Sequence, residues 1–202
     1  MYKKICIWGD SIAYGYSDLE KGGWVDRLKT RYLLEDGISF YNLGVSGDTT
    51  DDLLKRFDNE AETREPSIII FAIGINDSVY LKKENKFRVL KEKFKDNVFS
   101  LIIKSRKHAN DIVFIGANPV DEDKVTPIPW DPQANKNYYN KNIKKYNRIL
   151  NDIVKEENLI FIDIYNEFLK NTDYKKLLHD GLHPNSQGHQ LIFETVKKEL
   201  NL

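Results

Sequence analysis

The chain has 202 residues, and its 31 acidic and 31 basic side chains give a formal net charge of zero. No overall electric field favours nucleic acid or an anionic membrane, so nucleic-acid binding is not expected. A chain of this length buries roughly 70% of its unfolded surface, and we expect one domain spanning residues 1–202. The composition leaves the oligomeric state open.

We expect no secretory signal in the N-terminal segment, because it is poor in apolar residues. Only residues 5–8 form an apolar run between Lys4 and Asp10, which is much shorter than the apolar core of such a signal. No stretch approaches the roughly 20 apolar residues of a membrane span. The single cysteine, Cys6, lies in this run, where we expect a buried hydrophobe rather than a catalytic thiol. We therefore expect a soluble cytoplasmic protein.

Five short apolar runs alternate with segments of helical period. Apolar residues at successive positions are typical of strands that are covered on both faces. Between the runs, apolar residues recur at helical spacing, and we interpret these stripes as the core faces of helices. The runs comprise residues 5–8, 38–43, 68–73, 112–115 and 159–164, and the stripes fall within residues 24–32, 90–105, 139–153 and 191–200.

This alternation predicts the fold class α/β. Parallel neighbouring strands need crossover connections, which the helices supply. We predict a three-layer α/β/α domain with a flavodoxin-like five-stranded parallel sheet of order 2-1-3-4-5. In such sheets ligands bind at the carboxyl ends of the strands. The polar residues that follow each run are therefore candidates for a functional site.

The first polar cluster is Gly9-Asp10-Ser11, directly after the first run. A sharp turn here places the Ser11 hydroxyl at the carboxyl edge of the sheet, where a helix that starts just after it aims its backbone N–H groups. The alternative is that Asp10 or Ser11 only caps that helix, and taken alone this is the more common role.

Two further clusters supply hydrogen-bond donors. After the second run, Gly47 could present its backbone N–H group to an oxyanion, while Asp48 or Thr49 caps a following helix. After the third run, Asn76 offers an NH2 donor, and such a donor aimed at developing negative charge is worth roughly 10² to 10³ in rate. An Asx turn is the alternative role for Asn76.

The C-terminal cluster, with Asp180 three positions before His183, carries the most specific signal. Asp180 can accept the Nδ1–H of His183 and leave Nε2 free to take a proton. A metal cluster of both residues with His179 and His189 is a competing interpretation. We rank it lower because Gly181 breaks any helix that would align these side chains as ligands.

The irregular stretch 118–135 leaves the fourth run at the same carboxyl edge. It contains four prolines, is too long for an ordinary loop and is not expected to hold a helix. Trp130 within it is a candidate substrate-binding residue, since an aromatic side chain could form an apolar wall for an acyl or alcohol group. A plain surface excursion is equally compatible with the sequence.

Together, the blocks around Ser11, Gly47, Asn76 and His183 resemble the SGNH hydrolases, also called the GDSL esterase/lipase family. That family is named for a serine, a glycine, an asparagine and a histidine in this order, and the resemblance spans the whole chain. It implies a flavodoxin-like α/β/α fold and hydrolysis of carboxylic esters or thioesters. It also implies a mechanism that needs no metal and no other cofactor.

The resemblance assigns roles to five positions. It implies that Ser11 is the nucleophile, that His183 is the general base and then the acid, and that Asp180 orients His183. The backbone N–H groups of Ser11 and Gly47 and the side chain of Asn76 would then form the oxyanion hole. These roles describe a serine esterase that works through an acyl-enzyme.

The partner expected from this resemblance is a small-molecule ester, but its identity stays open. Short acyl groups on a sugar or a small alcohol are our preference, and a thioester or a lysophospholipid would suit the same site. Three alternatives come from other classes: an FMN carrier, a metal phosphohydrolase and a catalytically dead binding module. Residues 12–14 make a poor phosphate loop for the FMN carrier.

Overall fold

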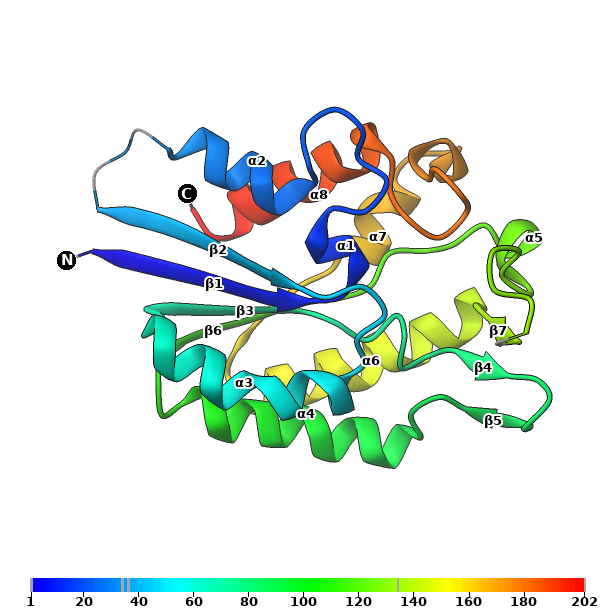
Figure 1. Ribbon diagram of the computed structural model, residues 1–202, viewed down its shortest axis with the longest axis horizontal. Helices are drawn as coiled ribbons and strands as arrows, with labels where there is room; N and C mark the ends of the chain where they lie inside the picture. Colours follow the sequence, from blue (N-terminus) through cyan, green and yellow to red (C-terminus); the bar gives the residue numbers. More distant parts are fainter. Residues whose placement is uncertain (1, 34, 36, 134, 202) are drawn as a thin grey trace.

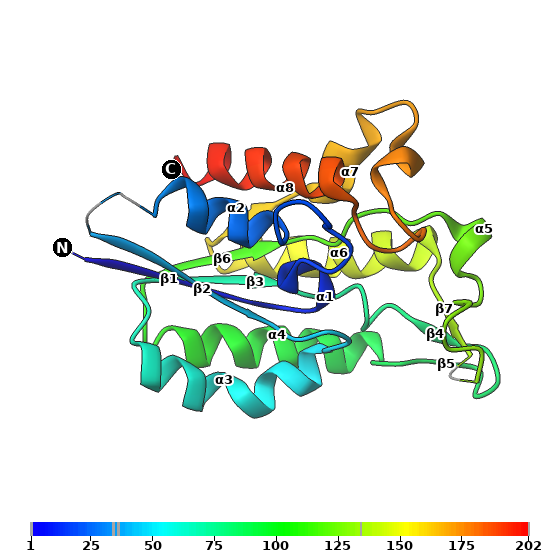
Figure 2. The ribbon, with the colours of Figure 1, turned by 45° about the horizontal axis from the view of Figure 1, so that its top comes forward.

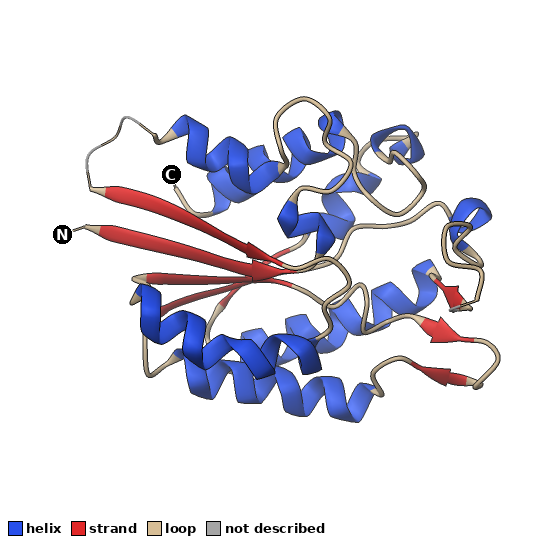
Figure 3. Cartoon of the chain, viewed as in Figure 1, coloured by secondary structure: helices blue, strands red, loops and turns tan. Residues whose placement is uncertain are grey.

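The computed structural model describes residues 2–33, 35, 37–133 and 135–201, and its centre is a five-stranded parallel sheet (Figure 3). The strands are β1 (Lys3–Gly9), β2 (Ile38–Gly44), β3 (Ile68–Ala72), β6 (Asp111–Ile115) and β8 (Ile160–Ile162). Their order in the sheet is β2-β1-β3-β6-β8. Numbered along the chain, this is the flavodoxin-like order 2-1-3-4-5, so the predicted topology is confirmed.

Helices cover both faces of this sheet (Figures 1 and 2). Strand β1 shows why, because Ile5 and Ile7 belong to the core on one face, whereas Cys6 and Trp8 belong to the core on the other. Among the helices of the described residues, none is both long and apolar enough to cross a membrane. Helices α3 (Thr50–Arg64), α4 (Lys91–Ser105) and α6 (Asn140–Glu156) lie on the Cys6 face, and α2 (Trp24–Arg31), α7 (Ile164–Leu169) and α8 (Ser186–Glu199) lie on the Ile5 face.

Two capped helices begin beside the candidate residues. Thr49 caps α3 in a capping box, in which its hydroxyl accepts the N–H of Asp52 and the Asp52 carboxylate accepts the N–H of Thr49. Asn185 caps α8 through its side-chain oxygen, which accepts the N–H groups of residues 187 and 188. Thr49 lies two residues after Gly47, and Asn185 lies two residues after His183. These caps therefore fix the backbone close to two of the predicted functional residues.

The fifth predicted strand, 159–164, is too long. Strand β8 ends at Ile162, and α7 begins at Ile164. The reason is Asp163, whose carboxylate accepts the N–H of Asn166 at 3.0 Å and so stops the strand by capping a helix. Ile164 is buried as expected, but as the first residue of that helix.

The expectation that residues 118–135 hold no helix is wrong. Helix α5 (Glu122–Val125) is only four residues long and fits between Pro119 and Pro127, so the prolines flank it without interrupting it. The strands β4 (Tyr80–Leu81), β5 (Lys86–Phe87) and β7 (Lys136–Asn137) form a second, antiparallel sheet that the sequence pattern did not predict. Figure 1 shows this small sheet beyond the carboxyl edge of the central sheet.

Candidate active site

Ser11 and His183, two of the three predicted catalytic residues, line one cavity at the carboxyl edge of the sheet. The cavity has a volume of about 310 Å³. Ser11 opens helix α1 (Ser11–Tyr14) directly after β1, and His183 lies in the loop before α8. These two residues are 172 positions apart in the chain, and the parallel sheet brings them together. The lining includes Ser11, Gly47, Asn76, Trp130, Tyr138 and His183.

Ser11, His183 and Asp180 form a continuous chain of contacts. The Oγ atom of Ser11 lies 2.9 Å from Nε2 of His183, and Nδ1 of His183 lies 2.7 Å from Oδ2 of Asp180. The other oxygen of Asp180 accepts the backbone N–H groups of Leu182 and His183 at 2.9 and 2.8 Å. An ionised Asp180 keeps the proton of neutral His183 on Nδ1, so Nε2 can accept the proton of Ser11.

The environment of Asp180 keeps its carboxyl group ionised. Partial burial raises its pKa, but the hydrogen bonds from the ring and backbone of His183 outweigh burial and lower the pKa to about 2. The carboxylate is therefore negative over the whole physiological range. A fixed negative charge at Nδ1 stabilises the imidazolium that forms when His183 takes a proton.

The turn after β1 explains how the chain presents Ser11. Asp10 caps α1, since its Oδ1 atom accepts the N–H of Ile12 at 2.9 Å. Gly9 packs against β3 so closely that a Cβ atom there would lie 2.5 Å from the carbonyl oxygen of Ala72. Both roles considered for this cluster are therefore present, since Asp10 caps the helix and Ser11 lies at the carboxyl edge of the sheet.

The three predicted oxyanion donors belong to residues that line this cavity, namely Ser11, Gly47 and Asn76. Within the described residues, the backbone N–H groups of Ser11 and Gly47 donate no hydrogen bond. Gly47 has a φ of 86°, a left-handed conformation that favours glycine. The Asn76 amide donates one hydrogen to the carbonyl of Asp48 at 3.0 Å, which leaves its second hydrogen for a ligand.

Tyr138 is a site residue that the sequence analysis missed. Its hydroxyl donates to Oδ1 of Asn76 at 2.9 Å, and both side chains are buried. With Asp48 on the other side, this bond fixes which edge of the Asn76 amide is the donor edge. The expected alternative of an Asx turn is therefore not the arrangement of this side chain. No short-range spacing marks Tyr138, because 62 positions separate it from Asn76.

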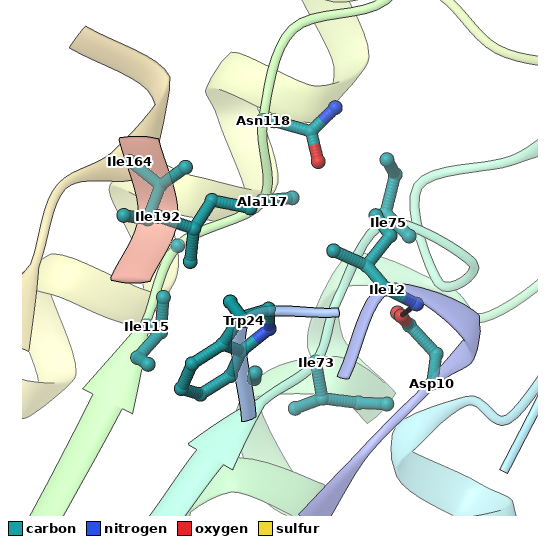
Figure 4. A pocket seen from close by; sticks show the side chains of 12 residues that line it. Asp10, Ile12, Trp24, Ile73, Ile75, Ile115, Ala117, Asn118, Ile164 and Ile192 are labelled. Carbon is teal, nitrogen blue, oxygen red and sulfur yellow. Dashed lines mark hydrogen bonds between the residues drawn. The ribbon is translucent and has the colours of Figure 1, made fainter. Parts of the chain in front are cut away.

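Two buried carboxyl groups lie beside the site. Burial, together with the smaller effect of the charges of Asp77 and Asp48, raises the pKa of Asp10 to about 7. Figure 4 shows Asp10 at a small cavity of about 20 Å³ that is lined mainly by isoleucines and Trp24. Burial likewise raises the pKa of Asp77 to about 6, although Asp77 accepts hydrogen bonds from the N–H and hydroxyl groups of Thr50. Asp77 thereby ties the start of α3 to the Asn76 loop.

Two exposed aromatic rings flank His183. The ring of Tyr16 lies 4.6 Å from the His183 ring, and the ring of Trp130 lies 6.0 Å from it on the cavity wall. About half of each side chain is exposed, 50% for Tyr16 and 49% for Trp130. Both rings are thus open to a ligand. Tyr16 was not singled out from the sequence.

The competing metal cluster does not form within the described residues, which hold no group of three or more His, Cys, Asp and Glu side chains placed to bind a metal ion. His189 lies in α8, and its Nε2 atom is 3.2 Å from the carbonyl oxygen of Tyr16. Burial lowers the pKa of His189 to about 4, so this ring is neutral near pH 7. His189 therefore supports the Tyr16 loop.

Comparisons with known proteins agree with this arrangement. The model of the GDSL-like Lipase/Acylhydrolase family matches residues 7–191. An acetylxylan esterase of Geobacillus stearothermophilus is 24% identical and covers 98% of this chain and 94% of its own. A Bacillus subtilis protein named as lipoprotein YqeF is 26% identical, with coverages of 97% and 88%.

Solved structures show the same architecture. A lipase/acylhydrolase from Enterococcus faecalis has a TM-score of 0.79 at 24% identity and covers 98% of this chain and 95% of its own. The acetylxylan esterase has a TM-score of 0.78 at 22% identity, with coverages of 99% and 94%. These likenesses bear out the three-layer α/β/α fold that the sequence predicted.

Proposed function

The chain belongs to the GDSL-like lipase/acylhydrolase family and is a carboxylic ester hydrolase, and from this premise we propose that it works through an acyl-enzyme on Ser11. The observation that carries the proposal is the chain of contacts from Ser11 through His183 to Asp180, which opens into the cavity. Catalytic mutants of the Geobacillus esterase replace a serine, an aspartate and a histidine, and that aspartate also stands three positions before the histidine.

The reaction has two halves. The Oγ atom of Ser11 attacks the acyl carbon while Nε2 of His183 takes the hydroxyl proton, and a tetrahedral oxyanion forms. The imidazolium, stabilised by Asp180, then gives this proton to the alcohol oxygen as the ester bond breaks. Water attacks the acyl-enzyme in the same way, and His183 returns the proton to Ser11 as the carboxylic acid leaves.

The oxyanion is stabilised by groups that are already in place. The N–H groups of Ser11 and Gly47 and the second amide hydrogen of Asn76 would donate to it. Because Asp48 and Tyr138 hold the amide of Asn76, little reorganisation is needed when the charge develops. This arrangement makes the three donors more useful in the transition state than with the neutral substrate.

Short acyl groups on a sugar or a small alcohol are the proposed substrates. The cavity of about 310 Å³ suits a small molecule, and exposed rings such as Tyr16 and Trp130 are suited to pack on the flat faces of sugars. One relative is named an acetylxylan esterase, which is in line with this class. A thioester or a lysophospholipid remains the alternative substrate of the same site.

The cellular location expected from the sequence stays a prediction. The name of one relative, a lipoprotein, gives the cytoplasmic location no support. Fractionation of the source cells, followed by immunodetection of the chain, would test it.

The proposal is tested by kinetics on 4-nitrophenyl acetate, butyrate and octanoate, followed by acetylated xylose. Ser11→Ala and His183→Ala should each lower kcat at least about 10³-fold, and the double variant should be no worse than either single one, because the two residues act as one unit. Ser100→Ala is the matched control, since its hydroxyl donates to Asp96 on α4, outside the cavity. Activity of Ser11→Ala within tenfold of wild type would refute the nucleophile.

Two measurements separate the alternatives from other classes. Loss of hydrolysis on treatment with a chelator would favour a metal phosphohydrolase. A protein that hydrolyses none of these esters and does not react with a fluorophosphonate would instead be a binding module.

A further inference from the structure

Two cationic side chains, Arg88 and Lys136, line the same cavity as Ser11. Neutral acetyl esters provide no partner for a positive charge, so these cations are unexplained by the proposed reaction. Lys136 has a partner in the cavity wall, because its Nζ atom lies 3.4 Å from Oδ2 of Asp131. Arg88 is therefore the cation whose role needs an explanation.

The guanidinium of Arg88 makes few direct contacts with the other described residues. Among the described residues its one ion pair is with Oδ2 of Asp52, at 3.8 Å, and its guanidinium donates no hydrogen bond. Asp52 already accepts hydrogen bonds from the Thr49 hydroxyl at 2.7 Å and from Lys55 at 2.9 Å. A distant, partly exposed ion pair of this kind contributes little to stability. The donors of Arg88 are thus available to a ligand.

The backbone holds Arg88 beside the predicted oxyanion donors. Arg88 follows β5 directly, and its N–H group donates to the carbonyl of Val79 at 2.8 Å. The next residue, Val89, donates to the carbonyl of Asp77, which adjoins Asn76. The Arg88 side chain is 28% exposed and shares the cavity wall with Gly47 and Asn76. A ligand in this cavity can therefore contact both Arg88 and Ser11.

We propose that Arg88 binds a carboxylate carried by the ester substrate. The planar guanidinium matches a carboxylate in a bidentate pair, and such pairs add specificity as well as energy. Since Lys136 is paired with Asp131, the charge of Arg88 balances a monoanion. The cavity admits a small molecule, so the carboxylate belongs to the acyl part or the alcohol part of a small acidic ester. This inference rests on the proposed esterase function and makes Arg88 its specificity determinant.

The test compares pairs of esters of nearly equal shape. One ester of each pair carries a carboxylate, and the other, the neutral ester, carries a carboxamide in its place. For the alcohol side, the pair is 4-acetoxybenzoate and 4-acetoxybenzamide. For the acyl side, the pair is 4-nitrophenyl glutarate monoester and 4-nitrophenyl 4-carbamoylbutanoate. For at least one pair, wild-type kcat/KM should be higher for the ester that carries the carboxylate than for the neutral one. Arg88→Gln should lower this ratio of kcat/KM values about tenfold or more, mainly by raising KM for the anionic ester.

Three comparisons keep the result specific to Arg88. Arg88→Lys should retain part of the preference, because it keeps the charge but loses the bidentate geometry. Lys93→Gln removes one exposed cation that lies outside the cavity and pairs with Asp51 at 3.9 Å, and it should leave the preference unchanged. Hydrolysis of the ester bond of the neutral esters by Arg88→Gln reports whether the variant still folds around an intact catalytic group.

Binding to the Ser11→Ala protein gives a readout that needs no turnover. In calorimetric titrations, 4-hydroxybenzoate should bind more tightly than 4-hydroxybenzamide, or glutarate more tightly than butyrate, and Arg88→Gln should remove the difference. Equal preference in wild type and Arg88→Gln on both sides, together with no difference in binding, would overturn the inference. If the neutral esters are still hydrolysed at their ester bonds, the esterase proposal survives that result. If no ester is hydrolysed but the binding difference appears, the esterase proposal fails and the anion site stands.

Discussion

The hydrogen bond from Tyr138 to Asn76 makes the most detailed prediction about catalysis. Tyr138→Phe removes only the hydroxyl that donates to Oδ1 of Asn76 at 2.9 Å. Asn76 is 4% exposed, so its oxygen would lose its partner with little access to water, at a cost of about 1–3 kcal/mol in the free energy of unfolding. The variant should therefore unfold at a lower urea concentration.

The effect on rate follows from the orientation of the amide. The hydroxyl contributes about 1 kcal/mol, as a typical hydrogen bond does, to the preference for the orientation that points NH2 at the oxyanion. Its loss should lower kcat about five- to tenfold, since 1.36 kcal/mol corresponds to a factor of ten, and leave KM nearly unchanged. The carbonyl of Asp48 still holds the other edge of the amide, so the loss should be smaller than that for removing Asn76 altogether.

Initial rates on 4-nitrophenyl acetate and urea unfolding of the same preparations measure both effects. Tyr165→Phe is the matched control, because Tyr165 is also buried and its hydroxyl also donates to an asparagine oxygen, that of Asn140, outside the cavity. It should lose stability and keep kcat. If kcat of Tyr138→Phe stays within twofold of wild type while stability falls as in the control, the orienting role is refuted.

Three further predictions concern neighbouring groups. Asn76→Ala should lower kcat about 10² to 10³-fold with little change in KM, and an unchanged kcat would remove Asn76 from the oxyanion hole. Trp130→Ala should change the ratio of kcat/KM for acetyl and butyryl esters more than the rate of phosphonate labelling; unchanged values with lower stability would make Trp130 a packing residue. The pKa of Asp10 is raised from 3.8 to about 7 on folding, so wild-type stability should fall as pH rises through that interval. For Asp10→Asn, the free energy of unfolding measured in urea between pH 4 and pH 8 should fall less steeply than for wild type, by up to about 1.4 kcal/mol per pH unit. The same pH profile in both proteins would contradict the raised pKa.

The central sheet was predictable because its strands are nearly continuous apolar runs. Residues buried on both faces leave a pattern that needs no knowledge of distant partners, as the alternation of Ile5 and Cys6 between two cores shows. The second sheet was not predictable, since each of its strands has two residues and carries no periodicity. The end of β8 was misplaced because Asp163 acts as a helix cap within an apolar stretch.

The residues of the candidate site likewise fall into those that the sequence predicted and those that it missed. Ser11, Asp180 and His183 were found because short motifs place a serine at a strand end and a carboxylate three positions before a histidine. Tyr138 and Arg88 lie in no such motif. Each directly follows a two-residue strand, Tyr138 after β7 and Arg88 after β5, and reaches the cavity only in the folded chain.

Mapping of a fluorophosphonate adduct tests the central claim, that Ser11 is the nucleophile activated by His183, most directly. The full chain would be treated with an alkyl fluorophosphonate and examined by intact-mass and peptide mass spectrometry, with His183→Ala and Ser100→Ala treated in parallel. We predict one adduct per chain, located on Ser11, formed at the wild-type rate in Ser100→Ala and at least about 10²-fold more slowly in His183→Ala, because a serine without its base is a weak nucleophile. An adduct on another residue, or no adduct in a preparation that hydrolyses esters, would contradict the account.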